Sequence, residues 1–107
     1  MKINKQIKVS GRVQGVFFRK STQQKALELG IKGWVKNEPD GSVLIEMEGN
    51  LSAMMEMEDW LKQGPPMAKV EFLEKSDGEV FNHADFLIVR WIAGNFFPEG
   101  LQSVEKK

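Results

Sequence analysis

The sequence contains no cysteine and a single histidine, His83, among its 107 residues. The absence of cysteine excludes disulfides, thiolate metal sites and thiol nucleophiles, and it is compatible with a cytoplasmic location, which we expect. One histidine excludes a metal site built from several histidines and a mechanism that needs two of them. We expect His83 to have only a surface role, because it lies in a polar segment between two apolar ones.

Long apolar segments are absent as well. No segment reaches the roughly 18 uninterrupted apolar residues of a membrane span, and the basic first residues lead into no apolar segment of the kind found in signal peptides. We therefore expect no membrane partner and no signal peptide. With 41% hydrophobic and 28% charged residues, the chain has the composition of a globular protein, and its length fits one domain.

Charge is distributed unevenly along the chain, although the formal net charge is zero. Residues 1–36 contain nine Lys or Arg and one acid, a net charge of +8, and residues 37–107 carry the balancing −8. A basic half suggests an anionic ligand near it, whereas a solvated basic face is the alternative that charge alone favours. The cations are scattered and not interleaved with exposed aromatics, so the pattern does not favour nucleic acid as a partner.

The spacing of apolar residues changes period several times, and each change marks an expected element. Alternation of apolar and polar residues predicts strands, and a spacing of three to four residues predicts helices. Gly30 suits a left-handed cap at the end of the first helix, and Asn50 or Ser52 can cap the start of the second. In chain order we expect a strand at 7–10, a helix at 18–29, strands at 31–36 and 43–48, a helix to about 63, and strands at 67–75 and 86–90.

This order is β-α-β-β-α-β plus one strand. It predicts an α+β fold, a ferredoxin-like α/β sandwich in which two helices cover one face of an antiparallel sheet. In the second helix we expect Leu51, Met54, Met55 and Leu61 to point inward. Residues 1–91 would form this domain, and residues 92–107 a C-terminal extension of unknown role that packs back against it.

The most informative segment is residues 11–19, Gly-Arg-Val-Gln-Gly-Val-Phe-Phe-Arg, where the strand period changes to the helix period. A tight loop before a helix directs several backbone amides at one point, where the helix dipole also favours negative charge. Gly11 and Gly15 permit a sharp turn and close approach of an anion, and Arg19 adds a two-pronged donor suited to phosphate oxygens. A plain turn explains the glycines alone, and a surface charge explains the arginine alone. When both occur together in the basic half, phosphate binding and these plain explanations are equally well supported.

This segment, with Gly-Trp-Val-Lys-Asn at residues 33–37 and Asp-Gly-Ser-Val at residues 40–43, closely resembles the acylphosphatase family over about residues 4–91. The resemblance implies a ferredoxin-like fold and hydrolysis of small acyl phosphates to carboxylate and phosphate, with no metal and no cofactor. It implies that the catalytic residues are Arg19, as phosphate ligand, and Asn37, as holder of the attacking water. It also implies a cradle for phosphate or sulfate formed by the backbone of Gln14, Gly15, Val16, Phe17, Phe18 and Arg19.

The residues present suit this reaction. The leaving carboxylate has a conjugate acid with a pKa of about 4 to 5, so it departs without a proton and needs no general acid. Backbone amides and Arg19 can hold the phosphoryl group, and Asn37 cannot act as a base but can orient a water. A thiol phosphatase would need a cysteine where Val13 stands, and a Walker loop would need a Gly-Lys-Ser/Thr sequence that is absent.

Two other functions remain open at this point. A module of the same fold could bind phosphate or another anion without turnover. A ferredoxin-like RNA-binding protein would need exposed aromatics on the first and third strands, and their alternating faces supply none. We expect a monomer with a small-molecule acyl phosphate as its partner. Glu38 departs from the family pattern, and its charge next to Asn37 would repel a dianion and slow the reaction.

Overall fold

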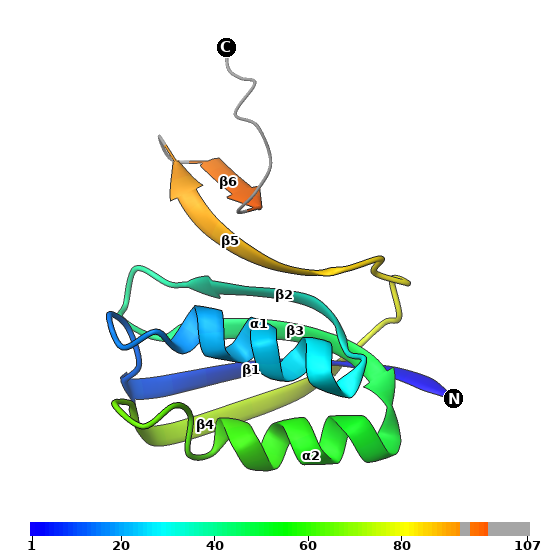
Figure 1. Cartoon of the computed structure of the whole chain (residues 1–107). Helices are drawn as coiled ribbons and strands as arrows, with labels where there is room; N and C mark the ends of the chain where they lie inside the picture. Colours follow the sequence, from blue (N-terminus) through cyan, green and yellow to red (C-terminus); the bar gives the residue numbers. More distant parts are fainter. Residues whose placement is uncertain (93–94, 99–107) are drawn as a thin grey trace.

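The computed structural model describes residues 1–92 and 95–98. They form six strands and two helices, and the predicted β-α-β-β-α-β order is confirmed, with further strands at its C-terminal end (Figure 1). In the extension 92–107, residues 95–98 form a strand that pairs antiparallel with the strand before it, and residues 93–94 and 99–107 lie outside the described part. The elements are β1 (Lys2–Arg12), α1 (Phe18–Leu29), β2 (Lys32–Asn37), β3 (Val43–Asn50), α2 (Leu51–Leu61), β4 (Lys69–Gly78), β5 (Phe86–Ile92) and β6 (Asn95–Pro98).

The strands form one sheet in the order β4-β1-β3-β2-β5-β6. Its neighbours are antiparallel except for β2 and β5, which pair in parallel through partners such as Val35 and Ile88. Figure 1 shows both helices lying over the same face of this sheet. This two-layer arrangement buries the apolar side of each layer, and it is the predicted ferredoxin-like sandwich.

Helix α1 has the predicted bounds because a glycine ends it. Gly30 has a φ of 72°, and the next amide, that of Ile31, donates to the Ala26 carbonyl at 2.8 Å. A left-handed residue at this position turns the chain out of the helix, which glycine does at little steric cost. The inward face carries Phe18, Thr22 and Ala26, all buried.

Helix α2 is capped by Asn50, whose side chain accepts a hydrogen bond from the Ala53 amide at 2.8 Å. Met54 and Leu61 are buried as predicted. The inward orientation expected for Leu51 and Met55 is wrong, since 59% and 58% of these residues are exposed. The buried stripe continues instead through Met57, which lies three residues after Met54 on the same helical face.

The core lies between the sheet and the helices. The alternation predicted for the first and third strands is confirmed, because every second residue there contributes to the core. The largest side chains that are fully buried include residues from both layers. The apolar ones are Phe18, Ile7, Ile31, Ile45, Met47, Met54, Met57, Leu61, Val9, Val13 and Val35.

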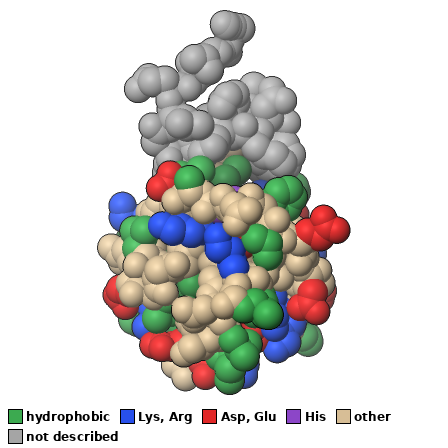
Figure 2. Space-filling model, turned by 90° about the vertical axis from the view of Figure 1, so that its right-hand side faces the viewer, with side chains coloured by type: hydrophobic (Ala, Val, Ile, Leu, Met, Phe, Trp, Pro, Cys, Tyr) green, Lys and Arg blue, Asp and Glu red, His purple; other side chains and the backbone are tan. Residues whose placement is uncertain are grey.

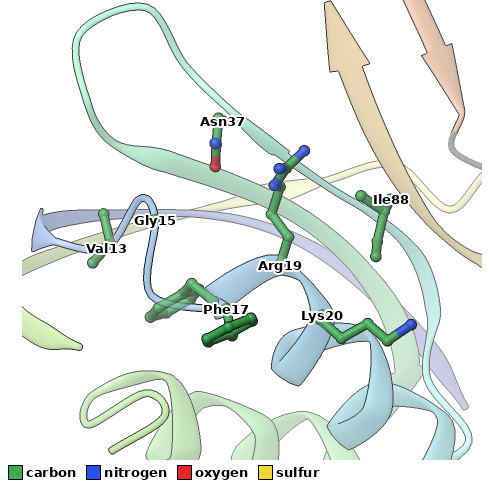
Figure 3. A pocket seen from close by; sticks show the side chains of 8 residues that line it. Val13, Gly15, Phe17, Arg19, Lys20, Asn37 and Ile88 are labelled. Atoms are coloured by element: carbon green, nitrogen blue, oxygen red, sulfur yellow. The ribbon is translucent and has the colours of Figure 1, made fainter. Parts of the chain in front are cut away.

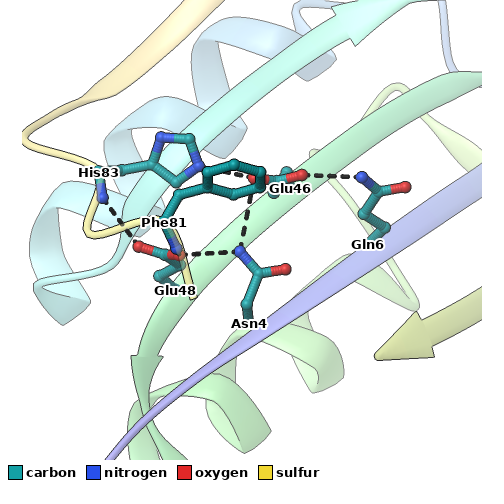
Figure 4. A network of polar contacts seen from close by, with 6 residues as sticks. All are labelled: Asn4, Gln6, Glu46, Glu48, Phe81 and His83. Carbon is teal, nitrogen blue, oxygen red and sulfur yellow. Dashed lines mark hydrogen bonds and ion pairs between the residues drawn. The ribbon is translucent and has the colours of Figure 1, made fainter. Parts of the chain in front are cut away.

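The opposite face of the sheet carries a buried polar network that joins β1 and β3 to the segment before β5 (Figure 4). Glu48 accepts hydrogen bonds from the Asn4 side chain at 2.9 Å, from the His83 amide at 2.9 Å and from the Phe81 amide. The His83 ring lies 2.6 Å from a Glu46 carboxylate oxygen, and its side chain is 23% exposed. The surface role expected for His83 is therefore wrong: this residue fastens the segment to the sheet.

The charge asymmetry along the sequence is partly neutralised in space. Lysines of the basic half form ion pairs with acids of the acidic half. These pairs neutralise positive charges that would otherwise attract an anionic ligand. At the end of the molecule opposite the β1–α1 loop, basic, acidic and apolar side chains are interspersed (Figure 2). The pairs are Lys5 with Glu58 at 3.2 Å, Lys8 with Asp40 at 2.8 Å and Lys36 with Glu38 at 3.4 Å.

Candidate active site

The loop between β1 and α1 has a backbone conformation that few residues adopt. Gly15 has a φ of 75°, and Phe17, the residue before the helix, has a φ of 63°. Positive φ is easy for glycine but costs an aromatic residue of order 1–3 kcal/mol. Phe17 is also 74% exposed, although it is a large apolar side chain. Strain and an exposed aromatic at one position are features that cluster at ligand-binding loops.

This loop leads into the N-terminus of α1, where the first backbone amides have no partner within the helix. The first backbone hydrogen bond of the helix is donated by the Ser21 amide to the carbonyl of Phe17, the residue before α1, at 3.0 Å. The three amides from Phe18 to Lys20 therefore have no carbonyl partner within the helix. No side chain caps this end and no acid lies in its first turn. The positive end of the helix dipole is thus left for an anion.

Arg19 stands in this first turn and is half-buried. Burial lowers the pKa of its guanidinium, and the positive charge of Arg90 lowers it further. An arginine nevertheless stays protonated at neutral pH. Arg19 is therefore a permanent cation that lacks full hydration and lies close to a second cation, an environment that an anion would relieve.

Asn37 is the last residue of β2. Its side-chain Oδ1 is buried and has no hydrogen-bond partner among the described residues. An unsatisfied buried acceptor costs about 1–3 kcal/mol and calls for an explanation. Figure 3 shows the oxygen end of this side chain directed toward the loop that contains Gly15.

Gln14 fastens the loop to the turn that follows Asn37. Its side-chain Nε2 donates to the carbonyls of Glu38 and Ser42, both at 2.9 Å. Asp40 closes this turn by accepting from the Ser42 amide at 3.0 Å and hydroxyl at 2.6 Å. The loop and the end of β2 are therefore held in a fixed relation, although 22 residues separate Gly15 from Asn37.

These features surround one open cleft of about 320 Å³ (Figure 3). Ligand sites usually start at about 300 Å³, so the cleft is of the size of a small-molecule site. Arg19 and Asn37 both line it, together with Gly15, Phe17 and Phe18 of the predicted cradle. The full lining is Val13, Gly15, Phe17, Phe18, Arg19, Lys20, Asn37 and Ile88.

Two members of the predicted cradle lie apart from this lining. Val16 is buried, and the side chain of Gln14 is occupied by the turn. Glu38, whose charge we expected to slow the reaction, lies outside the lining as well and pairs with Lys36 at 3.4 Å.

The sequence analysis missed Val13, Lys20 and Ile88 as residues of the cleft. Lys20 follows Arg19 directly, so its position in the first turn was a signal that could have been used. Ile88 reaches the cleft because β5 pairs in parallel with β2, and no local pattern in the sequence indicates that pairing.

Among the described residues, no group of three or more His, Asp or Glu side chains is placed to hold a metal ion. Neither helix in the described part is long and apolar enough to cross a bilayer.

The family comparison agrees with the geometry. A family model described as Acylphosphatase matches residues 5–88, which include both Arg19 and Asn37. The chain belongs to the acylphosphatase family. The resemblance found in the sequence is thereby confirmed, and the cleft described above lies within the matched acylphosphatase region.

Several acylphosphatases are similar over most of this region. That of Rubrobacter xylanophilus is 54% identical over 66 residues, which are 62% of this chain and 60% of that protein. That of Thiobacillus denitrificans is 45% identical over 73 residues, 68% of this chain and 82% of that protein. The solved structure of an acylphosphatase from Coxiella burnetii matches with a TM-score of 0.79 and 39% identity, covering 81% of this chain and 92% of that one.

Proposed function

We propose that this member of the acylphosphatase family hydrolyses the carboxyl-phosphate bond of small acyl phosphates without a metal ion. In this proposal the phosphoryl group lies in the cleft against the unpaired amides of the loop and of the first turn of α1. Arg19 donates to the same phosphoryl oxygens. The charge that these oxygens carry in the transition state is then stabilised by donors that are already in place.

Asn37 supplies the observation that carries the proposal. Its Oδ1 is buried and has no partner among the described residues, and Asn37 lines the same cleft as Arg19. An acceptor beside an anion site would repel phosphoryl oxygens, whereas a water bound there would donate a hydrogen bond to it. In this proposal a water next to the phosphorus atom supplies the hydrogen bond that this acceptor lacks.

The reaction requires no further group from the protein. The water oxygen forms a bond to phosphorus, the bond from phosphorus to the acyl oxygen breaks, and the carboxylate leaves with the electron pair. The proton of the water passes to a phosphoryl oxygen. Because a carboxylate is a stable anion at neutral pH, no acid has to protonate it. Positioning and electrostatics are then sufficient for catalysis.

The alternative is a module that binds phosphate in the same cleft without turnover. Release of orthophosphate from benzoyl phosphate in the presence of EDTA separates the two functions. We expect release far above the rate without protein, and no release from phenyl phosphate, whose leaving group is much poorer. Orthophosphate binding without any turnover of benzoyl phosphate would support the module, and turnover that EDTA abolishes and zinc restores would contradict metal-free hydrolysis.

A further inference from the structure

The cleft is larger than a phosphoryl group requires, and its lining is mixed in character. Gly15, Arg19 and Asn37 supply polar groups, whereas Phe17, Phe18 and Ile88 are apolar. Figure 3 shows the Arg19 guanidinium near Asn37, with Ile88 and the Lys20 ammonium farther away on the other side of Arg19. The side of the cleft beyond Arg19 is therefore bordered by Ile88 and by the Lys20 cation.

In-line displacement decides which part of the substrate enters that space. The attacking and leaving oxygens lie on opposite sides of phosphorus. With the water at Asn37, the acyl group has to extend away from Asn37, and Figure 3 places Ile88 and Lys20 in that direction. This step rests on the proposed function, because it uses the position proposed for the water.

Lys20 is available to a substrate at this place. It is exposed, and among the described residues it makes no ion pair. Lys25 in the same helix differs, since its ammonium lies 3.6 Å from a Glu28 carboxylate oxygen. The Lys20 stem can lie along apolar surface while its ammonium stays at the edge of the cleft.

We propose that Lys20 determines substrate preference by binding an anionic group at the far end of the acyl chain. The favoured substrates are then acyl phosphates that carry a second carboxylate, separated from the reacting carbonyl by an apolar spacer. The spacer contacts the apolar lining and the carboxylate meets the Lys20 ammonium. An uncharged acyl group also contacts the apolar lining but has no carboxylate to pair with the Lys20 ammonium.

Two rigid substrates of nearly equal shape test this proposal. 4-Carboxybenzoyl phosphate carries the second carboxylate, and 4-carbamoylbenzoyl phosphate replaces it with a neutral amide. The readout is the ratio of kcat/KM for the carboxylate substrate to that for the amide substrate, measured for the wild type, for Lys20→Gln, for Lys20→Arg and for Lys25→Gln. Because the ratio is taken within each variant, a general loss of activity does not affect it.

We expect Lys20→Gln to lower this ratio about fivefold, as for one partly exposed ion pair. Lys20→Arg keeps it, and so does Lys25→Gln, which removes the same charge elsewhere on α1. Raising the salt concentration to about 0.5 M should reduce the wild-type ratio, since exposed charges are screened. An equal ratio in the wild type and Lys20→Gln overturns the inference while leaving the proposed function intact; failure to hydrolyse either substrate overturns the proposed function itself.

Discussion

Gln14 is the residue that joins the two halves of the cleft. Its side-chain amide bonds two carbonyls of the turn after β2, and the cradle loop and Asn37 lie on either side of this contact. A small misplacement of a water-holding group relative to a bound phosphoryl group is costly, because the reaction depends on alignment. Gln14 is thus expected to matter for rate although its side chain does not face the substrate.

Replacing Gln14 with alanine tests this positioning role. We expect kcat/KM for benzoyl phosphate to fall about tenfold and the free energy of unfolding to fall by about 1 kcal/mol, since the carbonyls of Glu38 and Ser42 each lose one donor and keep a backbone amide as the other. Steady-state kinetics and urea unfolding measure the two effects. Gln24→Ala, at an exposed position of α1, is the matched control; a Gln14→Ala variant as active as this control would contradict the role.

At the scale of elements, the pairing of β2 with β3 depends on Gly33. A Cβ atom at this position would lie 1.9 Å from the Glu46 carbonyl oxygen, and the φ of Gly33 is +141°. The obstruction is backbone of the neighbouring strand, so it cannot move without separating the pair that positions Asn37. The close approach therefore requires glycine.

The substitution Gly33→Ala is expected to lower the free energy of unfolding by more than about 3 kcal/mol. Gly41→Ala provides the comparison, because Gly41 has a φ of +94° but no atom within 4 Å of its added Cβ. That variant bears only conformational strain, about 1–2 kcal/mol. Chemical denaturation of both variants measures the difference, and equal losses would show that crowding at Gly33 is unimportant.

The elements that the sequence predicted best have local signals. Helix α1 ends where Gly30 requires it to end, so its bounds were predicted correctly. The orientation of α2 was predicted less well, because this helix has apolar residues on more than one face. Spacings of three and four residues connect Leu51 with Met54 and Met55 as well as Met54 with Met57 and Leu61. Periodicity alone cannot choose between these faces, and packing against the sheet decides.

At the scale of the whole molecule, local signals were sufficient for one part of the site. The glycines and Arg19 lie in one motif, and the resemblance to a family added Asn37. The parallel pairing of β2 with β5, which brings Ile88 to the cleft, is a long-range contact without a local pattern. The polar network around Glu48 was also missed, because Glu46 and Glu48 alternate with apolar residues exactly as solvent-facing residues do in a half-exposed strand.

This network makes the stability of the fold depend on pH. Burial alone raises the pKa of Glu48, but hydrogen bonds from the Phe81 amide, the Asn4 side chain and the His83 amide outweigh burial, so the pKa lies below the ordinary 4.5. A carboxyl whose pKa is lower in the folded state stabilises the fold above its unfolded pKa. That stabilisation is lost as the pH falls from about 4.5 through the folded value.

We therefore expect Glu48→Gln to lower the free energy of unfolding at pH 7 by about 1.5–3 kcal/mol. The difference from the wild type should shrink as the pH falls below about 4.5 and through the folded pKa, because the wild-type carboxyl is then protonated as well. Urea unfolding at a series of pH values measures this convergence. Glu56→Gln, at an exposed position of α2, should differ little from the wild type throughout. A difference for Glu48→Gln that stays constant over the whole acidic range in which the fold persists would contradict the assignment.

The central claim is that the Arg19 guanidinium and the Asn37 carboxamide serve different steps in one cleft. Benzoyl phosphate turnover by Asn37→Ala, measured with orthophosphate as inhibitor and with Arg19→Ala alongside, tests it most directly. We predict that both variants lose about 10²- to 10³-fold in rate. Orthophosphate inhibition should weaken strongly for Arg19→Ala and stay within about threefold of the wild type for Asn37→Ala, whose role is to hold water. An Asn37→Ala variant that loses orthophosphate affinity as severely as Arg19→Ala, or one that keeps the wild-type rate, would contradict the account.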